Sequence, residues 1–218
     1  NKARQLEYYF GEAVQQDADT ILITGAVQSN FVRMAAAAAA KLDLACHIQL
    51  EERVNDIGAN YRDSGNVLLD HILGATIHTY PDGEDEAGAD ANLQSIADEL
   101  RSAGKRPYII PLAMGHPPLG ALGYIQAAIE LKSQLEKSNF EIDQIFVASG
   151  SGSTHAGLLF GCRSLKWPIR ITGVCVRRRR EQQINRIEKR CHDISRLLDI
   201  NNPVDSSDVE ITDETFSP

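Results

Sequence analysis

Two short polar stretches of this 218-residue sequence have residue types and spacing that suit anion binding. The first, Gln28-Ser29-Asn30, follows the apolar, β-branched run 20–23 and precedes Met34 and six alanines. This pattern predicts a strand that leads into the first turn of a helix, the place where open α/β sheets bind ligands. The N–H groups of such a turn suit a substrate carboxylate. The same residues are common helix caps, so the stretch alone indicates a cap as strongly as a site.

The second stretch, residues 149–154 (SGSGST), lies between a predicted strand at 144–148 and a predicted helix at 158–165. Small residues allow several backbone amides to point at one spot, and the hydroxyls add further donors. The following helix contributes the positive end of its dipole. A phosphate group is therefore the expected ligand, and a purely structural turn is the less favoured alternative.

These residues do not determine which molecule carries that phosphate. Gly150 and Gly152 match the first half of the dinucleotide pattern G-x-G-x-x-G, but position 155 is histidine. The four arginines at 177–180 follow the next predicted strand, where they could hold the extra phosphate of NADP. An NADP-dependent oxidoreductase is thus an alternative, although such a run is more often a solvated or interface patch.

The elements that position these stretches alternate between helix and strand. With no hairpin signal between strands, this alternation predicts an α/β fold with a mostly parallel sheet. Gly25 is expected to adopt a positive φ at the turn, and the alanines to let their helix approach the sheet closely. The other helices are predicted at 2–16, 65–73, 91–103, 121–136 and 181–198, the other strands at 45–50, 75–80, 108–110 and 169–176, and loops at 51–63, 81–90, 111–123 and 201–218.

Composition excludes some partners and compartments. The net charge of −8, from 22 basic and 30 acidic residues, makes nucleic acid an unfavoured partner. No apolar run is long enough to span a membrane and no signal peptide is recognised. The four cysteines form no C-x-x-C pair, which favours reduced thiols in a cytoplasm and no metal site. Since the chain starts without Met and ends without a terminal helix, we expect a piece of a longer protein.

Three segments in this order resemble the pyridoxal-phosphate enzymes of the D-cysteine desulfhydrase and 1-aminocyclopropane-1-carboxylate deaminase family. They are residues 1–8 (NKARQLEY), Gln28-Ser29-Asn30, and residues 151–157 (SGSTHAG). The resemblance covers almost the whole chain and is closest to the D-cysteine desulfhydrase branch, which includes enzymes that act on L-cysteate. It implies fold type II, as in the tryptophan synthase β chain: two open, mostly parallel twisted sheets with helices on both faces, here incomplete. Supporting matches lie at 36–44, 65–69 and 119–124.

The resemblance also implies roles for individual residues. Lys2, which alone would be taken for a solvated surface lysine, matches the lysine that forms a Schiff base with pyridoxal 5′-phosphate. Ser29 matches the hydroxyl that acts in proton transfer or attack on the substrate, and Asn30 the residue that hydrogen-bonds the cofactor's ring oxygen. The backbone of Gln28, Ser29 and Asn30 would hold the substrate carboxylate. The residues implied for the cofactor phosphate are Ser151, Gly152, Ser153 and Thr154.

By the same resemblance, residues 1–118 would form a small domain with Lys2 and the Ser-Asn turn, and residues 119–218 part of a large domain with the phosphate loop. The implied reaction is the β-elimination of a small sulfur-containing amino acid, foremost D-cysteine to pyruvate, sulfide and ammonia, by a cytoplasmic homodimer. L-Cysteate sulfo-lyase, 1-aminocyclopropane-1-carboxylate deaminase and an inactive homologue or fragment are the alternatives. Residues 113–118 (AMGHPP) replace the family's usual loop, and Phe31 its usual His or Gln, so the substrate stays open.

Overall fold

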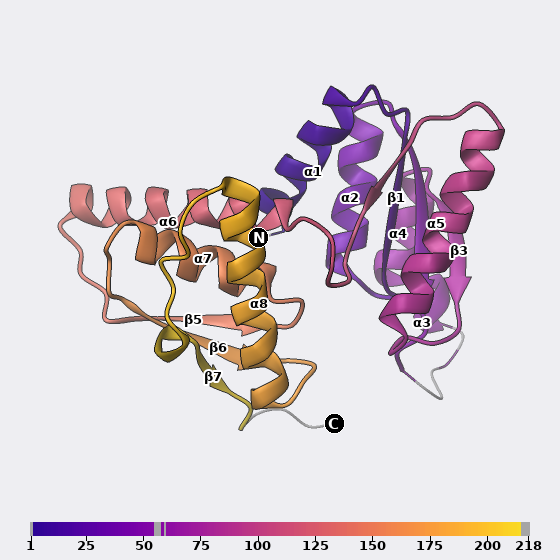
Figure 1. Cartoon of the computed structure of the whole chain (residues 1–218). Coiled ribbons are helices and arrows are strands. Elements are labelled where there is room, and N and C mark those ends of the chain that lie inside the picture. Colours follow the sequence, from indigo (N-terminus) through magenta and orange to yellow (C-terminus); the bar gives the residue numbers. More distant parts are fainter. Residues whose placement is uncertain (1, 55–57, 59, 215–218) are drawn as a thin grey trace. The chain divides into compact units, whose positions relative to one another are not determined.

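The computed structural model describes residues 2–54, 58 and 60–214. The chain divides into two compact units, residues 1–116 and 117–218, each built on its own parallel sheet (Figure 1). Asn1, residues 55–57 and 59 of the predicted loop 51–63, and residues 215–218 of the predicted tail lie outside the described part.

The first unit has a four-stranded sheet in the order β3-β2-β1-β4, in which every pair of neighbours is parallel. Its strands are β1 (Thr20–Ala26), β2 (Ala45–Glu51), β3 (Thr76–Tyr80) and β4 (Pro107–Ile110). Its helices are α1 (Ala3–Gln15), α2 (Asn30–Lys41), α3 (Asn60–Asp63), α4 (Gly65–Ile72) and α5 (Glu86–Ser102).

The strand order places a topological switch point beside β1. The chain steps from β1 to β2 and β3 in one direction, and then returns to β4 on the other side of β1. Because parallel crossovers are right-handed, α2 and α4 belong on one face of the sheet and α5 on the other. The packing agrees: α2 contacts α1 and α4, whereas α5 contacts β1 and β4. The carboxyl end of β1 is therefore where an open α/β sheet binds its ligand.

The alanines of α2 let this helix lie close to the sheet, as expected. Ala35, Ala36 and Ala39 are fully buried. On the opposite face, Leu22 of β1 packs against Leu93 and Ala97 of α5. Apolar packing on both faces of β1 thus holds the strand that carries the turn at 27–30.

The second unit has three parallel strands in the order β5-β6-β7. Both crossovers step in the same direction, so α7 and α8 cover the same face, and α6 packs against α7. The elements are α6 (Leu119–Ser138), β5 (Gln144–Ser149), α7 (Ser153–Ser164), β6 (Arg170–Cys175), α8 (Arg180–Leu198), the 3₁₀ turn η1 (Ser206–Asp208) and β7 (Glu210–Thr212).

Glycines allow α6 and α7 to touch backbone to backbone. A Cβ on Gly157 would lie 2.4 Å from the carbonyl oxygen of Ala121, and one on Gly161 would lie 2.8 Å from the Cβ of Ala128. Neither space admits a side chain. This close packing, with the fully buried Phe160 beside it, holds the helix that begins at the predicted phosphate loop.

The α/β fold with parallel sheets is confirmed, and several boundaries are corrected. Helix α5 begins at Glu86 rather than 91, because Asp85 caps it by accepting the Gly88 N–H at 2.8 Å. Helix α7 begins at Ser153 rather than 158. The predicted loop 51–63 contains α3, and the predicted tail contains η1 and β7. A strand as short as β7 has too few residues for a periodic signal.

All four cysteines, Cys46, Cys162, Cys175 and Cys191, are buried and unpaired. Within residues 2–54, 58 and 60–214, none of the helices has the length and apolar character needed to cross a membrane. The same residues include no group of three or more His, Cys, Asp or Glu side chains placed to hold a metal ion.

Candidate functional site

The turn after β1 is shaped by a helix cap. Ser29 is the N-cap of α2, and its Oγ accepts a hydrogen bond from the Val32 N–H at 3.3 Å. The Ser29 N–H itself donates to the carbonyl of Ala26 at 2.9 Å. Gln28 and Ser29 therefore precede the helix, and Asn30 begins it, which corrects the prediction that all three lie in its first turn. The cap lies where a ligand would meet the positive end of α2.

Gly25 serves close packing rather than an unusual backbone conformation. It is not among the described glycines with positive φ, so that prediction is wrong. A Cβ at Gly25 would instead lie 2.7 Å from Val32 Cγ2 and 3.2 Å from Ser29 Oγ. The absence of a side chain brings the start of α2 against the end of β1, and this fixes where Ser29 lies.

The side chain of Gln28 is hydrogen-bonded to the segment at 61–66. Its Nε2 donates to the carbonyls of Tyr61 at 2.6 Å and Ser64 at 3.0 Å, and its Oε1 accepts the Asn66 N–H at 2.9 Å. Gly65 has φ +59° there, and a Cβ on it would lie 2.6 Å from Gln28 Oε1. The side-chain amide of Gln28 is thus engaged within the first unit.

Asn66 also contributes to this site, and the sequence analysis did not identify it as a functional residue. Its Nδ2 donates to the Gln28 carbonyl at 2.9 Å and to Asn30 Oδ1 at 3.1 Å. The separation of 36 residues from Asn30 leaves no local pattern to detect. The one signal in the sequence is the family-like stretch 65–69, which supports the resemblance and assigns no role to Asn66.

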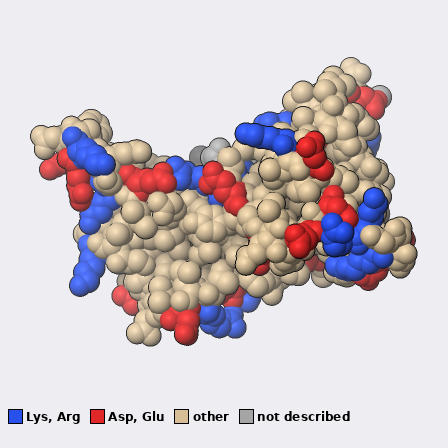
Figure 2. Space-filling model, turned by 90° about the horizontal axis from the view of Figure 1, so that it is seen from above, with Lys and Arg blue, Asp and Glu red and all other residues tan. Residues whose placement is uncertain are grey.

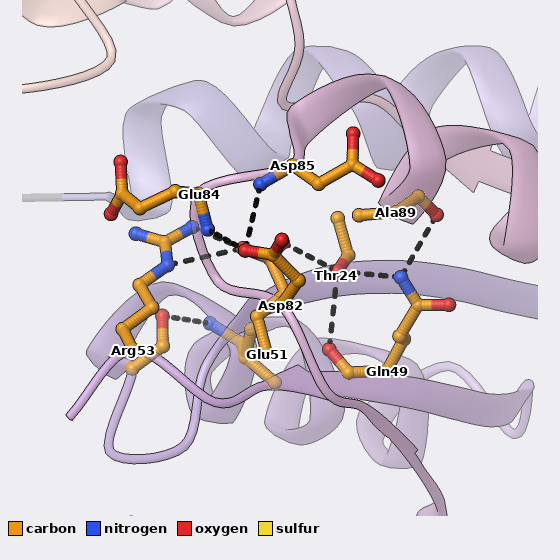
Figure 3. Close-up of polar contacts among 10 residues, drawn as sticks. Thr24, Gln49, Glu51, Arg53, Asp82, Glu84, Asp85 and Ala89 are labelled. Atoms are coloured by element: carbon orange, nitrogen blue, oxygen red, sulfur yellow. Dashed lines mark hydrogen bonds and ion pairs between the residues drawn. The ribbon is translucent and has the colours of Figure 1, made fainter. Parts of the chain in front are cut away.

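A buried polar network ties the carboxyl ends of β1 and β2 to α5 (Figure 3). The Thr24 hydroxyl donates to Glu51 Oε1 at 2.7 Å and accepts from Gln49 Nε2 at 3.1 Å. Gln49 Nε2 also donates to the Ala89 carbonyl at 2.9 Å, and Arg53 Nε donates to Glu51 Oε2 at 3.0 Å. Because each buried polar group has a partner, the network stabilises the strand end just before the turn.

Lys2 is the N-cap of α1, where its carbonyl accepts the N–H groups of Gln5 at 3.0 Å and Leu6 at 3.1 Å. Burial lowers the pKa of the Lys2 amine from its ordinary value of 10.5. A lysine with a lowered pKa spends more time as the neutral amine, which is the form that attacks an aldehyde. This environment differs from that of a solvated surface lysine.

The predicted phosphate loop leads into α7 through a left-handed glycine. Gly152 has φ +91°, and a Cβ there would lie 3.2 Å from Ile187 Cδ1, so both conformation and space favour glycine. Ser153 and Thr154, each 8% exposed, follow in the first turn of the helix. The first N–H groups of a helix have no partner four residues earlier, and adjacent N–H groups of such a turn form an anion-binding concavity.

Side chains from α8 and from the segment before it hold the carbonyls of this loop. Gln183 Nε2 donates to the Gly150 carbonyl at 3.1 Å, Arg178 Nη1 donates to the same oxygen at 3.2 Å, and Arg186 Nε donates to the Ser151 carbonyl at 3.0 Å. In a trans peptide the C=O and N–H groups point in opposite directions. The N–H groups that follow these two carbonyls therefore point away from α8, as a bound phosphate requires.

The run of arginines at 177–180 makes contacts within the chain itself, as Arg178 and Arg180 show. Arg178 holds the phosphate loop, and Arg180 Nε donates to the Ile211 carbonyl at 3.0 Å while its N–H donates to Asp213 at 2.9 Å. These contacts argue against the interpretation of the run as a site for the extra phosphate of NADP, and against a merely solvated patch.

His155 lies against the sheet beneath the loop. It is fully buried, with Nδ1 3.2 Å from Ser149 Oγ, and a Cβ on Gly173 would lie 2.4 Å from the same nitrogen. Gln183 also donates to Ser149 Oγ, at 2.8 Å. Burial lowers the pKa of His155 to about 4, against an opposing hydrogen bond with the Ile171 backbone. The residue thus supports the loop as a neutral side chain.

This lowered pKa predicts a pH-dependent stability. In the unfolded chain His155 binds a proton below about pH 6.5, whereas in the folded chain it does so only below about pH 4. The free energy of unfolding should therefore fall by up to about 3 kcal/mol as the pH drops from 7 to 4. His155→Asn should lose this contribution. Urea unfolding of both proteins at pH 7 and pH 4.5 checks it; equal losses in the two would contradict the prediction.

The structure thus gathers the predicted residues into two sets. Gln28, Ser29 and Asn30 lie together in the first unit, to which Lys2 also belongs. The set that lies together in the second unit is Ser151, Gly152, Ser153 and Thr154. The second set fits a phosphate group, and the first has a polar turn at a helix N-terminus beside the switch point.

Comparison with known proteins identifies the family of the chain. The family described as "Pyridoxal-phosphate dependent enzyme" matches residues 1–212. D-Cysteine desulfhydrases of Serratia proteamaculans (strain 568) and Salmonella newport (strain SL254) are each 36% identical over all 218 residues of this chain. The chain spans 64% of the length of these relatives.

Solved structures show the same relationship. A protein described as an ACC deaminase homologue superposes with a TM-score of 0.81 at 34% identity, over 96% of this chain and 60% of the other. A hydrogen sulfide-producing enzyme (Fn1220) from Fusobacterium nucleatum, 16% identical, shares the fold with a TM-score of 0.58 over 79% of this chain and 53% of its own. With the family match across nearly its whole length, this chain belongs to the pyridoxal-phosphate-dependent enzyme family, whose cofactor is pyridoxal phosphate.

Proposed function

We propose that the protein that contains this chain is a carbon–sulfur lyase that converts D-cysteine to pyruvate, sulfide and ammonia. The observation that carries the proposal is the loop at 151–154, where left-handed Gly152 and the held carbonyls turn N–H groups toward one side, as a cofactor phosphate needs. The substrate comes from the relatives named D-cysteine desulfhydrase, at 36% identity over the whole chain.

The residues of the first unit would act on the cofactor and on the substrate. Pyridoxal phosphate, when bound, supplies an electron sink for negative charge at the substrate's α-carbon. Lys2 would hold the cofactor covalently through its neutral amine and carry a proton between steps. The Ser29 hydroxyl would also carry a proton. Because its Oγ accepts from Val32, the Ser29 O–H remains a donor for the substrate. The Asn30 carboxamide would hydrogen-bond the cofactor's ring oxygen.

Gln28, Ser29 and Asn30 would contribute unequally to the binding of a substrate carboxylate. The Ser29 N–H already donates to Ala26, so it is not available to a substrate. The Asn30 N–H and the positive end of α2 are better placed to hold the carboxylate of an amino acid. The side chain of Gln28 would hold the turn in shape through the segment at 61–66.

A product panel tests the proposal and separates the alternatives. Sulfide and pyruvate from D-cysteine are expected. Sulfite from L-cysteate, or 2-oxobutyrate from 1-aminocyclopropane-1-carboxylate, would move the assignment within the family, as the divergent residues 113–118 allow. Bound cofactor with no keto acid from any of these substrates would indicate an inactive homologue.

Ser29→Ala should lower kcat/KM for the accepted substrate by about 10²- to 10⁴-fold, because it removes a proton-transfer group. It also removes a helix cap, which costs about 1 kcal/mol of stability. Asp85→Ala is the matched control, since it deletes the cap of α5 without touching the turn. Steady-state kinetics and urea unfolding of both variants check the claim; an equal kinetic loss in the control would show that only the cap matters.

The proposal extends to a homodimer in the cytoplasm that uses small amino acids rather than polyanions or membranes. The unpaired, buried state of all four cysteines supports a reducing compartment. On the face drawn in Figure 2, acidic and basic side chains are interspersed, and the net charge is −8. Mixed charge of this kind differs from the basic face that nucleic acid favours. Light scattering of the full-length protein measures its oligomeric state.

A further inference from the structure

We propose that Asn66 is a positioning residue that sets which end of the Asn30 carboxamide faces the cofactor. The inference rests on the proposed function, because it assigns Asn30 to the ring oxygen of pyridoxal phosphate. It concerns a residue on α4, outside the turn and outside the phosphate loop. Its basis is a chain of hydrogen bonds within the first unit that starts from backbone groups, whose donor and acceptor identities are fixed.

The first link orients Gln28. Its amide nitrogen lies 2.6 Å from the Tyr61 carbonyl and 3.0 Å from the Ser64 carbonyl, and carbonyls only accept hydrogen bonds. That end must therefore be the NH₂ group. The other end is then the oxygen, which suits the Asn66 backbone N–H at 2.9 Å. Two acceptors and one donor from the backbone leave a single orientation for the Gln28 amide.

The second link orients Asn66, and through it Asn30. One side-chain atom of Asn66 lies 2.9 Å from the Gln28 carbonyl, so that atom must be its NH₂ nitrogen. The same nitrogen lies 3.1 Å from the Asn30 side chain and donates there. The Asn30 atom that faces Asn66 must accept, so it is the carbonyl oxygen. The NH₂ group of Asn30 is thereby turned away from Asn66.

This orientation matches the chemistry of the cofactor. The ring oxygen of pyridoxal phosphate is an acceptor, and it carries negative charge when ionised. An asparagine offers it a donor only when its NH₂ end faces the ring. If the carboxamide turned over, two oxygens would face each other and the bond would become a repulsion. Asn66 holds the NH₂ end of Asn30 toward the ring oxygen. The charge-assisted hydrogen bond is then made by Asn30, and Asn66 does not touch the cofactor.

Two probes distinguish this role from a general effect on folding. Dissociation constants are measured by equilibrium dialysis on the full-length protein, for pyridoxal phosphate and for its analogue without the ring hydroxyl. Asn66→Ala should weaken binding of pyridoxal phosphate about 10-fold or more and leave binding of the analogue nearly unchanged. Asn66→Asp keeps the size and the backbone N–H but accepts from Asn30 instead, so it should weaken pyridoxal phosphate binding at least as much.

Two controls complete the experiment. Asn92→Ala removes a similar amide bond, from Asn92 Nδ2 to Gln49 Oε1 at 2.7 Å, on a different helix, and should bind both probes as the unmodified protein does. Asn30→Ala should remove most of the effect of a second change at Asn66. Equal losses for both probes in the Asn66 variants would overturn the positioning role alone. Failure of the unmodified protein to bind pyridoxal phosphate would overturn the proposed function and this role together.

Discussion

Replacing Lys2 with alanine should lower the rate of pyruvate release by about 10³-fold or more, the largest effect expected of any single substitution in this chain. The substitution removes the amine that would hold the cofactor and move a proton at the substrate. Lys41→Ala, at the exposed end of α2, removes a lysine with no such role and should leave the rate unchanged. Pyruvate formation measured by a coupled assay compares the two variants.

The lowered pKa of Lys2 also predicts how capture of the cofactor depends on pH. The neutral amine is the reactive form, and its fraction rises with pH. Because burial moves the pKa below 10.5, covalent capture of the cofactor by the apoprotein should reach half its maximum below that pH. Borohydride reduction followed by peptide mapping at each pH should label Lys2. Labelling of another lysine, or a midpoint like that of an exposed lysine, would contradict the role.

Local patterns were sufficient to predict the elements that carry the site. The apolar run before Thr24 and the alanines after Arg33 each have the signature of one element, so the strand, the turn and the helix could be anticipated. The space around Gly25 could not, because it depends on how closely Val32 approaches in three dimensions. A pattern of residue types cannot distinguish a glycine needed for φ from a glycine needed for contact.

The supports of the site were the least predictable part. Asn66 acts on Asn30 across 36 residues, and Gln183 and Arg186 reach the loop from 33 and 35 residues further along the chain. Such contacts arise from the packing of α4 against α2, and of α8 against α7, rather than from any sequence spacing. The polar turn and the phosphate loop were recognisable by residue type, and Lys2 only by the family resemblance, whereas the residues that hold them emerged only from the folded chain.

The second large effect is expected at the carbonyls of the phosphate loop. Replacing both Gln183 and Arg186 with leucine should weaken the binding of pyridoxal phosphate by about 100-fold. Without these donors the Ser151 carbonyl can turn and the Gly150 carbonyl keeps only the Arg178 contact, so their peptides no longer hold N–H groups toward the phosphate. Fluorescence titration of the apoprotein measures the affinity.

Pyridoxal, which lacks the phosphate, separates this mechanism from general destabilisation. Its affinity should be nearly the same for the double variant and the unmodified protein, since the loop would contribute little to it. Gln144→Leu with Arg163→Leu is the matched control, because these side chains also donate to groups within the second unit, Thr172 Oγ1 at 2.6 Å and the Trp167 carbonyl at 2.9 Å. The control should keep its preference for the phosphorylated ligand. A parallel loss of affinity for both ligands in the loop variant would mean that α8 supports the fold of the unit and not the phosphate site.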